Sequence, residues 1–424
     1  MGRNAYFYHM FKNPLFRALL PILCIMCASC SCEDNSKEVY VPVDPNGNGQ
    51  TETPAKVVWH ERAYETFGAI DRLYKVGSGA TAGFYNENYP KGSGDLSASY
   101  LWPYDGLMSG VALLNRLGYD VDYKAKIERF QAYWRTSGAV AVGGYGSQTN
   151  GTAGGGERFY DDNSIVGLNL VEAYRQLGDP VYLDRCARIV QFLLSGEDDV
   201  MGGALWWCEG LKNKPGNGDS NKPACANGYA QWFLTSYYDI CPESEKAGVL
   251  SLAKRLYEWE YNNLRDPEDN VYWNSKGADG VVNTTKWTYN SGAMIASGVR
   301  LYKITGEEHY LTEAKATADG AYNYFVRGRN GIALCYPLND PWFTIKIVRS
   351  YIELEPYHSN CSRYIETFIA DLERAWKDGR NDRGLFYEDW SGKNINPERD
   401  KSLLMQDAAL ESLGTIALYK GEKK

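Results

Sequence analysis

Two consecutive aspartates, Asp161 and Asp162, are the residues whose type and spacing are best suited to catalysis. Hydrolysis of a glycosidic bond generally uses two carboxyl groups: one donates a proton to the leaving oxygen, and the other attacks the sugar or activates water. Adjacent carboxyl groups in a partly buried site repel each other, so the two can take different protonation states. The alternative is that the pair only caps a helix, because aspartate is frequent at helix N-termini.

The elements that must position this pair are amphipathic segments that follow one another from Val57 onward. Apolar residues recur at helical spacing, as in the stripe Cys361, Tyr364, Ile365, Phe368 and Leu372. No stretch shows sustained alternation with a period of two, so the sequence predicts an all-α protein. The pattern predicts twelve helices, over 57–76, 101–117, 121–136, 160–176, 181–195, 226–240, 243–263, 287–305, 307–326, 341–355, 359–378 and 401–419.

The connections between these helices alternate in length. Each even-numbered helix passes to the next odd one through a tight link with a glycine or proline stop, as at Gly178 and Gly306, and these links recur as a weak internal repeat. Most odd-to-even connections are long and rich in glycine, asparagine and aromatic residues. Odd helices carry a charged face, whereas even helices are mostly uncharged. Six buried helices inside six amphipathic ones predict an (α/α)6 barrel over 57–424; an α-solenoid is the weaker alternative.

In such a barrel, the N-termini of the six inner helices open beneath the long loops. These helix starts carry polar and aromatic residues, including the acid pair, and we expect them to converge on one cavity into which the helix dipoles direct partial positive charge. Loops held by a rigid scaffold commonly carry function. The sequence therefore predicts one site on the long-loop side of the barrel.

Composition and motifs exclude several other classes. The net charge of −8 argues against a nucleic-acid binder, and a mean hydropathy of −0.45 argues against a multi-span membrane protein. No Cys-x-x-Cys spacing or close histidine pair suggests a metal site, and no Gly-x-Ser-x-Gly elbow suggests a serine hydrolase. Cys208 and Cys225 flank one loop, so they could pair in an oxidising compartment or stay free. Trp206 and Trp207 in that loop could stack on sugar rings or close the loop on itself.

Residues 1–29 read as a lipoprotein signal peptide. A basic stretch precedes a short apolar run and small residues before Cys30, which is the expected lipidation site, with Cys32 as the weaker candidate. Residues 30–56 are polar and rich in proline, glycine and asparagine, which predicts a flexible tether. We therefore expect a lipid-anchored protein of the outer membrane or cell surface, with the periplasmic face as an alternative. An ordinary cleaved secretory signal is the other interpretation.

Several blocks together resemble glycoside hydrolase family 76 across 57–419. They are the run from Glu157 to Asp162, the Gly202-Gly203 and Trp206-Trp207 pairs, the run from Thr288 to Gly292, and the late run from Gln406 to Leu410. The resemblance implies an endo-α-1,6-mannanase with a retaining mechanism, in which Asp161 is the nucleophile and Asp162 the general acid/base. Family members often carry aromatic residues shortly after the acid pair, where this chain has Ile165 and Val166.

The leading hypothesis is thus a monomeric, surface-anchored hydrolase that cleaves internal α-1,6 linkages of α-mannan, such as that of fungal cell walls, without a cofactor or metal. The alternatives are a non-catalytic glycan-binding lipoprotein, a transglycosidase, or a hydrolase of another glycan on the same fold. The expected sugar-stacking residues are Trp102, Tyr104, Tyr289 and Trp342, and the expected hydroxyl-binding residues are Asn227, Asn290 and Gln406.

Overall fold

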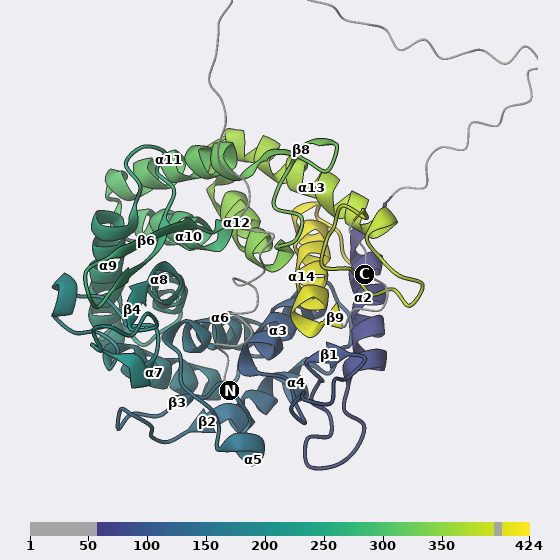
Figure 1. Ribbon diagram of the computed structural model, residues 1–424, viewed down its shortest axis with the longest axis horizontal. Helices are drawn as coiled ribbons and strands as arrows, with labels where there is room; N and C mark the ends of the chain where they lie inside the picture. Colours follow the sequence, from purple (N-terminus) through teal and green to yellow (C-terminus); the bar gives the residue numbers. More distant parts are fainter. Residues whose placement is uncertain (1–56, 394–400) are drawn as a thin grey trace, which may run out of the picture. The chain divides into compact units, whose positions relative to one another are not determined.

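The computed structural model describes residues 57–393 and 401–424, which belong to one compact unit, Val57–Lys424. The predicted signal peptide, Cys30 and the predicted tether lie outside the described residues. Within the unit, helices form two concentric rings (Figure 1). The prediction of an (α/α)6 barrel is confirmed.

Six helices form the inner ring, and each packs against the next until the last closes on the first. Their sequences are apolar or rich in small residues on most sides, which lets neighbouring backbones approach closely. The inner helices are α3 (Leu101–Arg116), α6 (Tyr160–Leu177), α8 (Ala224–Tyr238), α10 (Thr288–Thr305), α12 (Pro341–Leu354) and α14 (Leu403–Tyr419).

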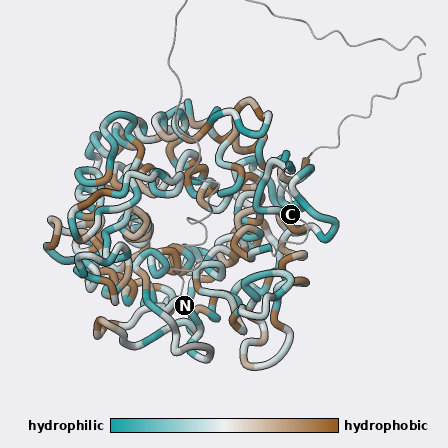
Figure 2. The backbone as a smooth tube through the Cα atoms, viewed as in Figure 1, coloured by the Kyte–Doolittle hydropathy of each residue, from teal (hydrophilic) through white to brown (hydrophobic). Residues whose placement is uncertain are grey.

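The outer ring is made of amphipathic helices that bury one stripe against the inner ring. In Figure 2 hydrophobic and hydrophilic residues alternate along these outer helices. The predicted stripe from Cys361 to Leu372 is buried. The outer helices are α2 (Trp59–Tyr74), α4 (Tyr123–Glu128), α7 (Val181–Leu194), α9 (Glu243–Leu264), α11 (Glu308–Phe325) and α13 (Asn360–Asp378).

One predicted helix is shorter than expected. The segment predicted as 121–136 forms only α4 and a following 3-10 turn, Arg129–Tyr133. The turn ends where Trp134 enters a strand paired with Tyr145, so strand pairing competes with helix extension. A four-residue helix, α5 (Asn150–Ala153), lies in the next connection.

The tight links end their helices as predicted. Gly178 and Gly306 adopt left-handed backbone conformations, with φ of 69° and 74°, and donate their N–H groups to the carbonyls of Tyr174 and Tyr302. Glycine adopts this conformation without the penalty that a side chain would impose. The short links thus fix the ends of the inner helices opposite the long connections.

The long connections contain short strands that the sequence pattern did not reveal. Each strand is too short for period-two alternation to be visible. The strands are β1 (Asn88–Tyr89), β2 (Trp134–Arg135), β3 (Gly144–Tyr145), β4 (Asn221–Pro223), β5 (Trp273–Gly277), β6 (Val282–Lys286), β7 (Arg327–Arg329), β8 (Ile332–Cys335) and β9 (Lys401–Ser402). They pair antiparallel as β1–β9, β2–β3, β4–β5–β6 and β7–β8.

A repeated bridge ties each outer helix to the segment that leads into the following inner helix. Shortly after every outer element ends, one residue pairs antiparallel with a residue farther along the same connection. The six pairs are Lys75–Tyr85, Trp134–Tyr145, Glu197–Leu205, Arg265–Tyr272, Arg327–Cys335 and Arg380–Phe386. The long connections are therefore not irregular throughout, and each has a fixed point before its inner helix begins.

Four of these fixed points are held by the fourth residue of the next inner helix. In α8, Asn227 accepts the N–H of Leu205 at 2.8 Å and donates to the Leu205 carbonyl at 3.1 Å. In α14, Gln406 makes the same pair of bonds to Phe386, at 2.8 and 3.0 Å. Asn163 of α6 accepts the N–H of Tyr145, and Ser291 of α10 accepts the N–H of Tyr272. These side chains satisfy buried backbone groups that the helices themselves cannot reach.

Candidate active site

The acid pair occupies the first turn of α6, on the long-loop side of the barrel. Asp161 is half-buried and Asp162 is buried, and the N–H of Asp162 donates to Asp161 Oδ1 at 3.0 Å. Unpaired N–H groups at a helix N-terminus carry partial positive charge, which stabilises a carboxylate placed there. The first turn of α6 is thus suited to hold an ionised carboxyl group.

Two further donors converge on the other oxygen of Asp161. Trp207 Nε1 donates to Asp161 Oδ2 at 3.1 Å, and Cys225 Sγ donates to the same oxygen at 3.3 Å. The Tyr160 N–H in turn donates to the Trp207 carbonyl at 3.0 Å, so the loop that carries the indole is tied to the start of α6. Of the two tryptophans in this loop, Trp206 is buried and binds Asp198 at 2.6 Å, which closes the loop, whereas Trp207 contacts the acid pair.

A buried ion pair anchors the chain as it enters α6. Arg158 is fully buried, and its guanidinium makes two hydrogen bonds to Glu209, with Nε at 2.7 Å from Oε1 and Nη2 at 2.5 Å from Oε2. The same guanidinium donates to the carbonyls of Val140 and Val142. Because Arg158 lies three residues before Asp161, this cluster fixes the loops around the acid pair and its approach to the barrel.

The second residue of each inner helix lies in one ring at this end of the barrel. The six are Trp102, Asp161, Cys225, Tyr289, Trp342 and Leu404. The apolar members belong to a cluster distinct from the main core of the barrel. Within it, Tyr289 stacks on Phe343 with ring centroids 4.1 Å apart, and Trp102 meets Trp342 edge-to-face at 5.3 Å. Three of the predicted stacking residues, Trp102, Tyr289 and Trp342, are thus brought together in the same ring as Asp161.

The fourth predicted stacking residue, Tyr104, lies elsewhere. It is the fourth residue of α3, fully buried in the main core, with its hydroxyl donating to the Lys126 carbonyl at 2.8 Å. Its ring packs against Phe84, Phe130 and Tyr133 and has no exposed surface for a sugar. The structure therefore contradicts the expectation for Tyr104.

Asn227 and Gln406 are also placed differently from the prediction. Both amides are fully buried, and both bind the backbone of the preceding bridge residue, so their hydrogen-bonding groups are occupied within the protein. Asn290, the third residue of α10, differs: neither its amide nitrogen nor its amide oxygen has a hydrogen-bond partner among the described residues. Asn290 is therefore the one predicted hydroxyl-binding residue whose side chain keeps unused polar atoms.

Asp407, next to Gln406, was not among the residues predicted from the sequence; it is fully buried and lies against Gly106 of α3. Both of its carboxyl oxygens lack hydrogen-bond partners among the described residues, and the Trp342 Nε1 atom does too. A Cβ atom on Gly106 would lie 3.1 Å from that nitrogen and 3.3 Å from Asp407 Oδ2, so both groups meet in front of this glycine. Burial, with the charges of Glu411 and Glu87, raises the pKa of Asp407 well above its usual range. Asp407 lies three residues after Leu404 on α14, and this helical spacing could have indicated that the two side chains share a face of the helix.

Charged residues form a buried cluster deeper between α12 and α14. Glu411 accepts from Lys346 at 2.5 Å and from Arg349 at 2.6 Å. Burial alone would raise the pKa of Glu411, but the two cations lower it overall. Burial lowers the pKa of Lys346. The acidic group here is therefore ionised and paired, in contrast to Asp407 one turn away on the same helix.

The six cysteines in the described residues are free thiols, so the suggested Cys208–Cys225 disulfide is absent. Cys208 instead donates to Glu157 Oε2 at 3.5 Å. In the same part of the chain, no group of three or more histidine, cysteine, aspartate or glutamate residues is arranged to hold a metal ion. Nor does any helix described here have the length and apolar character needed to cross a membrane.

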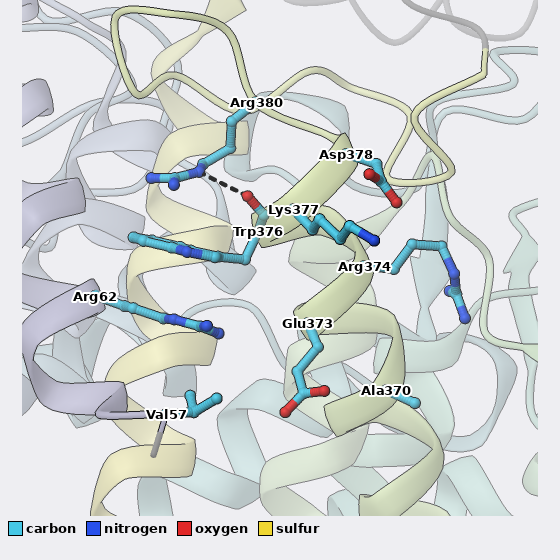
Figure 3. Close-up of a pocket in the computed structure, with 9 residues that line it drawn as sticks. All are labelled: Val57, Arg62, Ala370, Glu373, Arg374, Trp376, Lys377, Asp378 and Arg380. Atoms are coloured by element: carbon cyan, nitrogen blue, oxygen red, sulfur yellow. Dashed lines mark hydrogen bonds between the residues drawn. The ribbon is translucent and has the colours of Figure 1, made fainter. Parts of the chain in front are cut away.

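A pocket of about 670 Å³ lies on the outer ring, between α2 and α13 (Figure 3). Its central side chain, Trp376, is sandwiched between two guanidinium groups, with Arg62 Cζ at 4.8 Å and Arg380 Cζ at 3.3 Å from the ring centroid. Both faces of the indole are thus covered by cations, and no face is open for a sugar ring. This pocket does not share residues with the acid pair.

A closed double ring of helices with two carboxyl groups at the start of an inner helix is typical of helical-barrel glycoside hydrolases. The sequence model of glycosyl hydrolase family 76 matches residues 71–346, more than half of the chain, and the protein belongs to this family. None of the curated protein sequences compared with the chain matches it significantly.

Solved structures of other proteins share the fold. A family 76 α-mannanase from Bacteroides thetaiotaomicron is 25% identical, with a TM-score of 0.73, and the match covers 87% of this chain and 97% of that one. An inactive α-1,6-mannanase variant from Salegentibacter sp. HEL1_6, with two consecutive aspartates replaced by alanine and α-1,6-mannotetrose bound, is 20% identical; its TM-score is 0.69 and the coverage is 85% and 99%. Dfg5 from Chaetomium thermophilum, in complex with glucosamine, is 15% identical, with a TM-score of 0.66 and coverage of 86% and 91%.

Proposed function

We propose that this glycoside hydrolase is a retaining endo-α-1,6-mannanase that acts on the backbone of α-mannan. The observation that carries the proposal is the Asp161–Asp162 pair in the first turn of α6, beside a ring of aromatic side chains. Family membership and the α-mannanase activities of the structural relatives support the same substrate class. The replacement of two consecutive aspartates in the inactive Salegentibacter variant supports the assignment of the pair as the catalytic residues.

In the proposed mechanism, Asp161 attacks the anomeric carbon of the mannosyl unit while Asp162 donates its proton to the glycosidic oxygen. The C–O bond to the leaving chain breaks, and a covalent glycosyl ester with Asp161 forms. Asp162, now ionised, accepts a proton from water as that water attacks the same carbon, which releases Asp161 and restores both groups. The donors to Asp161 favour its ionised form, and the burial of Asp162 favours a protonated acid.

For substrate binding, we propose Trp102 as the stacking residue and Asn290 as a hydroxyl contact. Trp102 is partly exposed and lies in the same ring as Asp161, and aromatic faces suit the apolar faces of sugars. Trp342 and Tyr289, predicted as stacking residues too, are 1% and 6% exposed and pack against other rings, so they support the ring instead of binding sugar. Asn290 has the unused polar atoms that a sugar hydroxyl would satisfy. No cofactor or metal takes part in this scheme, since two carboxyl groups supply both proton transfer and covalent capture.

The test of the proposed function is product analysis on linear and side-chain-bearing α-mannans. We expect short manno-oligosaccharides from linear α-1,6-mannan, with the first product released as the α anomer by proton NMR. Asp161→Asn and Asp162→Asn should each lose about a thousandfold or more of kcat. Full activity in both variants would refute the site, and a β anomer as first product would refute the retaining mechanism. Transfer to an added acceptor sugar instead of water would indicate a transglycosidase.

We also propose that the protein is anchored to the outer membrane or cell surface through a lipid on Cys30. The support is the sequence pattern alone: a basic stretch, an apolar run and small residues before this cysteine. Expression with an alkyne-tagged fatty acid should label the protein, and Cys30→Ala should abolish the label while Cys32→Ala keeps it. Labelling that survives in Cys30→Ala would refute this assignment.

A further inference from the structure

Cys225 is the second residue of α8, and its thiol is directed at the acid pair. Its Sγ atom donates to Asp161 Oδ2 at 3.3 Å, and Trp207 Nε1 donates to the same oxygen at 3.1 Å from a different element. The remaining oxygen, Oδ1, accepts the N–H of Asp162 at 3.0 Å. Three donors from α6, α8 and the loop that carries Trp207 therefore fix both oxygens of one carboxyl group.

The thiol acts as a donor and not as a nucleophile. Burial, followed by the charge of Asp161 and the hydrogen bond to it, raises the pKa of Cys225 well above its usual range. The group therefore keeps its proton across the range in which a glycoside hydrolase works, and a protonated thiol can only donate or accept weakly. Cys225 is also a position where the equivalent residues of other inner helices are mostly aromatic or aliphatic.

We infer that Cys225 and Trp207 are positioning residues for the reaction: together they hold the carboxylate of Asp161 ionised and in a fixed orientation for attack on the sugar. This inference rests on the proposed function. Charge-assisted hydrogen bonds stabilise the ionised form of a carboxyl group, and this stabilisation is lost when the group is protonated. Removing one donor should therefore make Asp161 easier to protonate and move the acidic limb of the pH–rate profile to higher pH.

The two tyrosines around this contact do not ionise in the same range. Tyr229 on α8 and Tyr289 on α10 both interact with the charge of Asp161, and burial raises the pKa of each well above its usual range, so both stay neutral. Glu260 on α9 interacts with Cys225, and burial also raises its pKa well above the usual range. Asp162 is a further titratable neighbour, and as the proposed acid it governs the basic limb.

The experiment compares the pH profile of kcat/KM in the full-length protein and in three cysteine variants, on linear α-1,6-mannan. Cys225→Ala removes the donor and should move the acidic limb upward by about half to one pH unit. Cys225→Ser keeps a hydroxyl donor and should return the limb toward that of the unmodified protein. Cys241→Ala is the matched control. Cys241 lies beyond the end of α8, and its buried thiol donates to the Tyr238 carbonyl, so its removal should leave the profile unchanged.

An acidic limb in Cys225→Ala that coincides with that of the unmodified protein would overturn the inference, even if kcat falls. Trp207→Phe provides a second test that does not depend on the cysteine variants folding, because it removes the indole N–H and keeps the ring; it should shift the same limb in the same direction. Failure of the proposed function is distinguishable, since it would appear as retained activity in Asp161→Asn whatever the cysteine variants do.

Discussion

Two buried asparagines on inner helices, Asn227 and Asn290, should respond differently to substitution by alanine: the first variant should lose stability, and the second should lose affinity for the substrate. Asn227→Ala removes three hydrogen bonds, two to the backbone of Leu205 and one to the Pro223 carbonyl. It leaves a buried N–H without a partner, which typically costs 1–3 kcal/mol, so the total loss should be about 3 kcal/mol. Asn290→Ala removes no hydrogen bond to a described residue and should cost about 1 kcal/mol or less.

These losses convert to melting temperatures through the entropy of unfolding. At about 2.1 cal/mol/K per residue, a unit of about 370 residues unfolds with about 0.8 kcal/mol/K, so 3 kcal/mol lowers Tm by about 4 °C. Scanning calorimetry of both variants measures this difference. Well below Tm, Asn227→Ala should keep its KM for α-1,6-mannan, whereas Asn290→Ala should raise KM by about two- to tenfold if a sugar hydroxyl uses its amide.

The reasoning is refuted if Asn227→Ala melts with the unmodified protein, because the clamp on Leu205 would then contribute nothing. It is equally refuted if Asn227→Ala raises KM at unchanged Tm, since that behaviour would assign the residue to the substrate, as the sequence first suggested. Asn163→Ala in α6 provides an internal comparison for the clamp, because Asn163 makes the same pair of bonds to the backbone of Tyr145.

Two further predictions concern stability. Burial raises the pKa of Asp371 to about 6 despite Arg374 and the Tyr336 N–H, so the folded state favours its protonated form; this stabilisation is present below about pH 3.8 and is lost as pH rises through 6. The unfolding free energy of the unmodified protein minus that of Asp371→Asn, from urea titrations, should fall by about 2 kcal/mol between pH 4 and 6, and a flat difference would contradict the assignment. Gly292→Ala should destabilise by about 1–3 kcal/mol because its Cβ would lie 2.8 Å from the Ile347 Cα, whereas Gly68→Ala, with open space around it, should stabilise by about 0.5–1 kcal/mol; equal effects in thermal melts would contradict this packing.

The sequence predicted the fold closely because helical periodicity and glycine stops are local signals. The boundaries of α6, α10 and α13 fall within one or two residues of the predicted ones. The exception is α4, which is shortened because Trp134 pairs with Tyr145, a residue outside the segment whose helical pattern was considered. Short bridges leave little periodicity, but Gly83, Gly203, Asn270 and Gly384 have positive φ and each stands two residues before a bridge residue, which is a readable signal.

For the site, the sequence identified the acid pair and the ring of aromatic residues but could not separate neighbouring positions on one helix turn. The second residue of each inner helix lies in the ring, and in four of the six helices the fourth residue binds the preceding bridge. Tyr104, Asn227 and Gln406 are fourth residues, so their types suggested binding while their positions gave them structural roles. The contact between Cys225 and Asp161 joins two different helices, and no local pattern encodes such a pairing.

The repeated bridge also bears on how this barrel can vary. The chain between bridged partners is shortest at Arg380–Phe386 and longest at Trp134–Tyr145, yet each pairing places the following inner helix in the same ring. Replacements confined between two partners therefore leave both the fixed point and the inner helix that follows it in place. These segments could be exchanged one at a time while the turn that carries Asp161 and Asp162 stays intact.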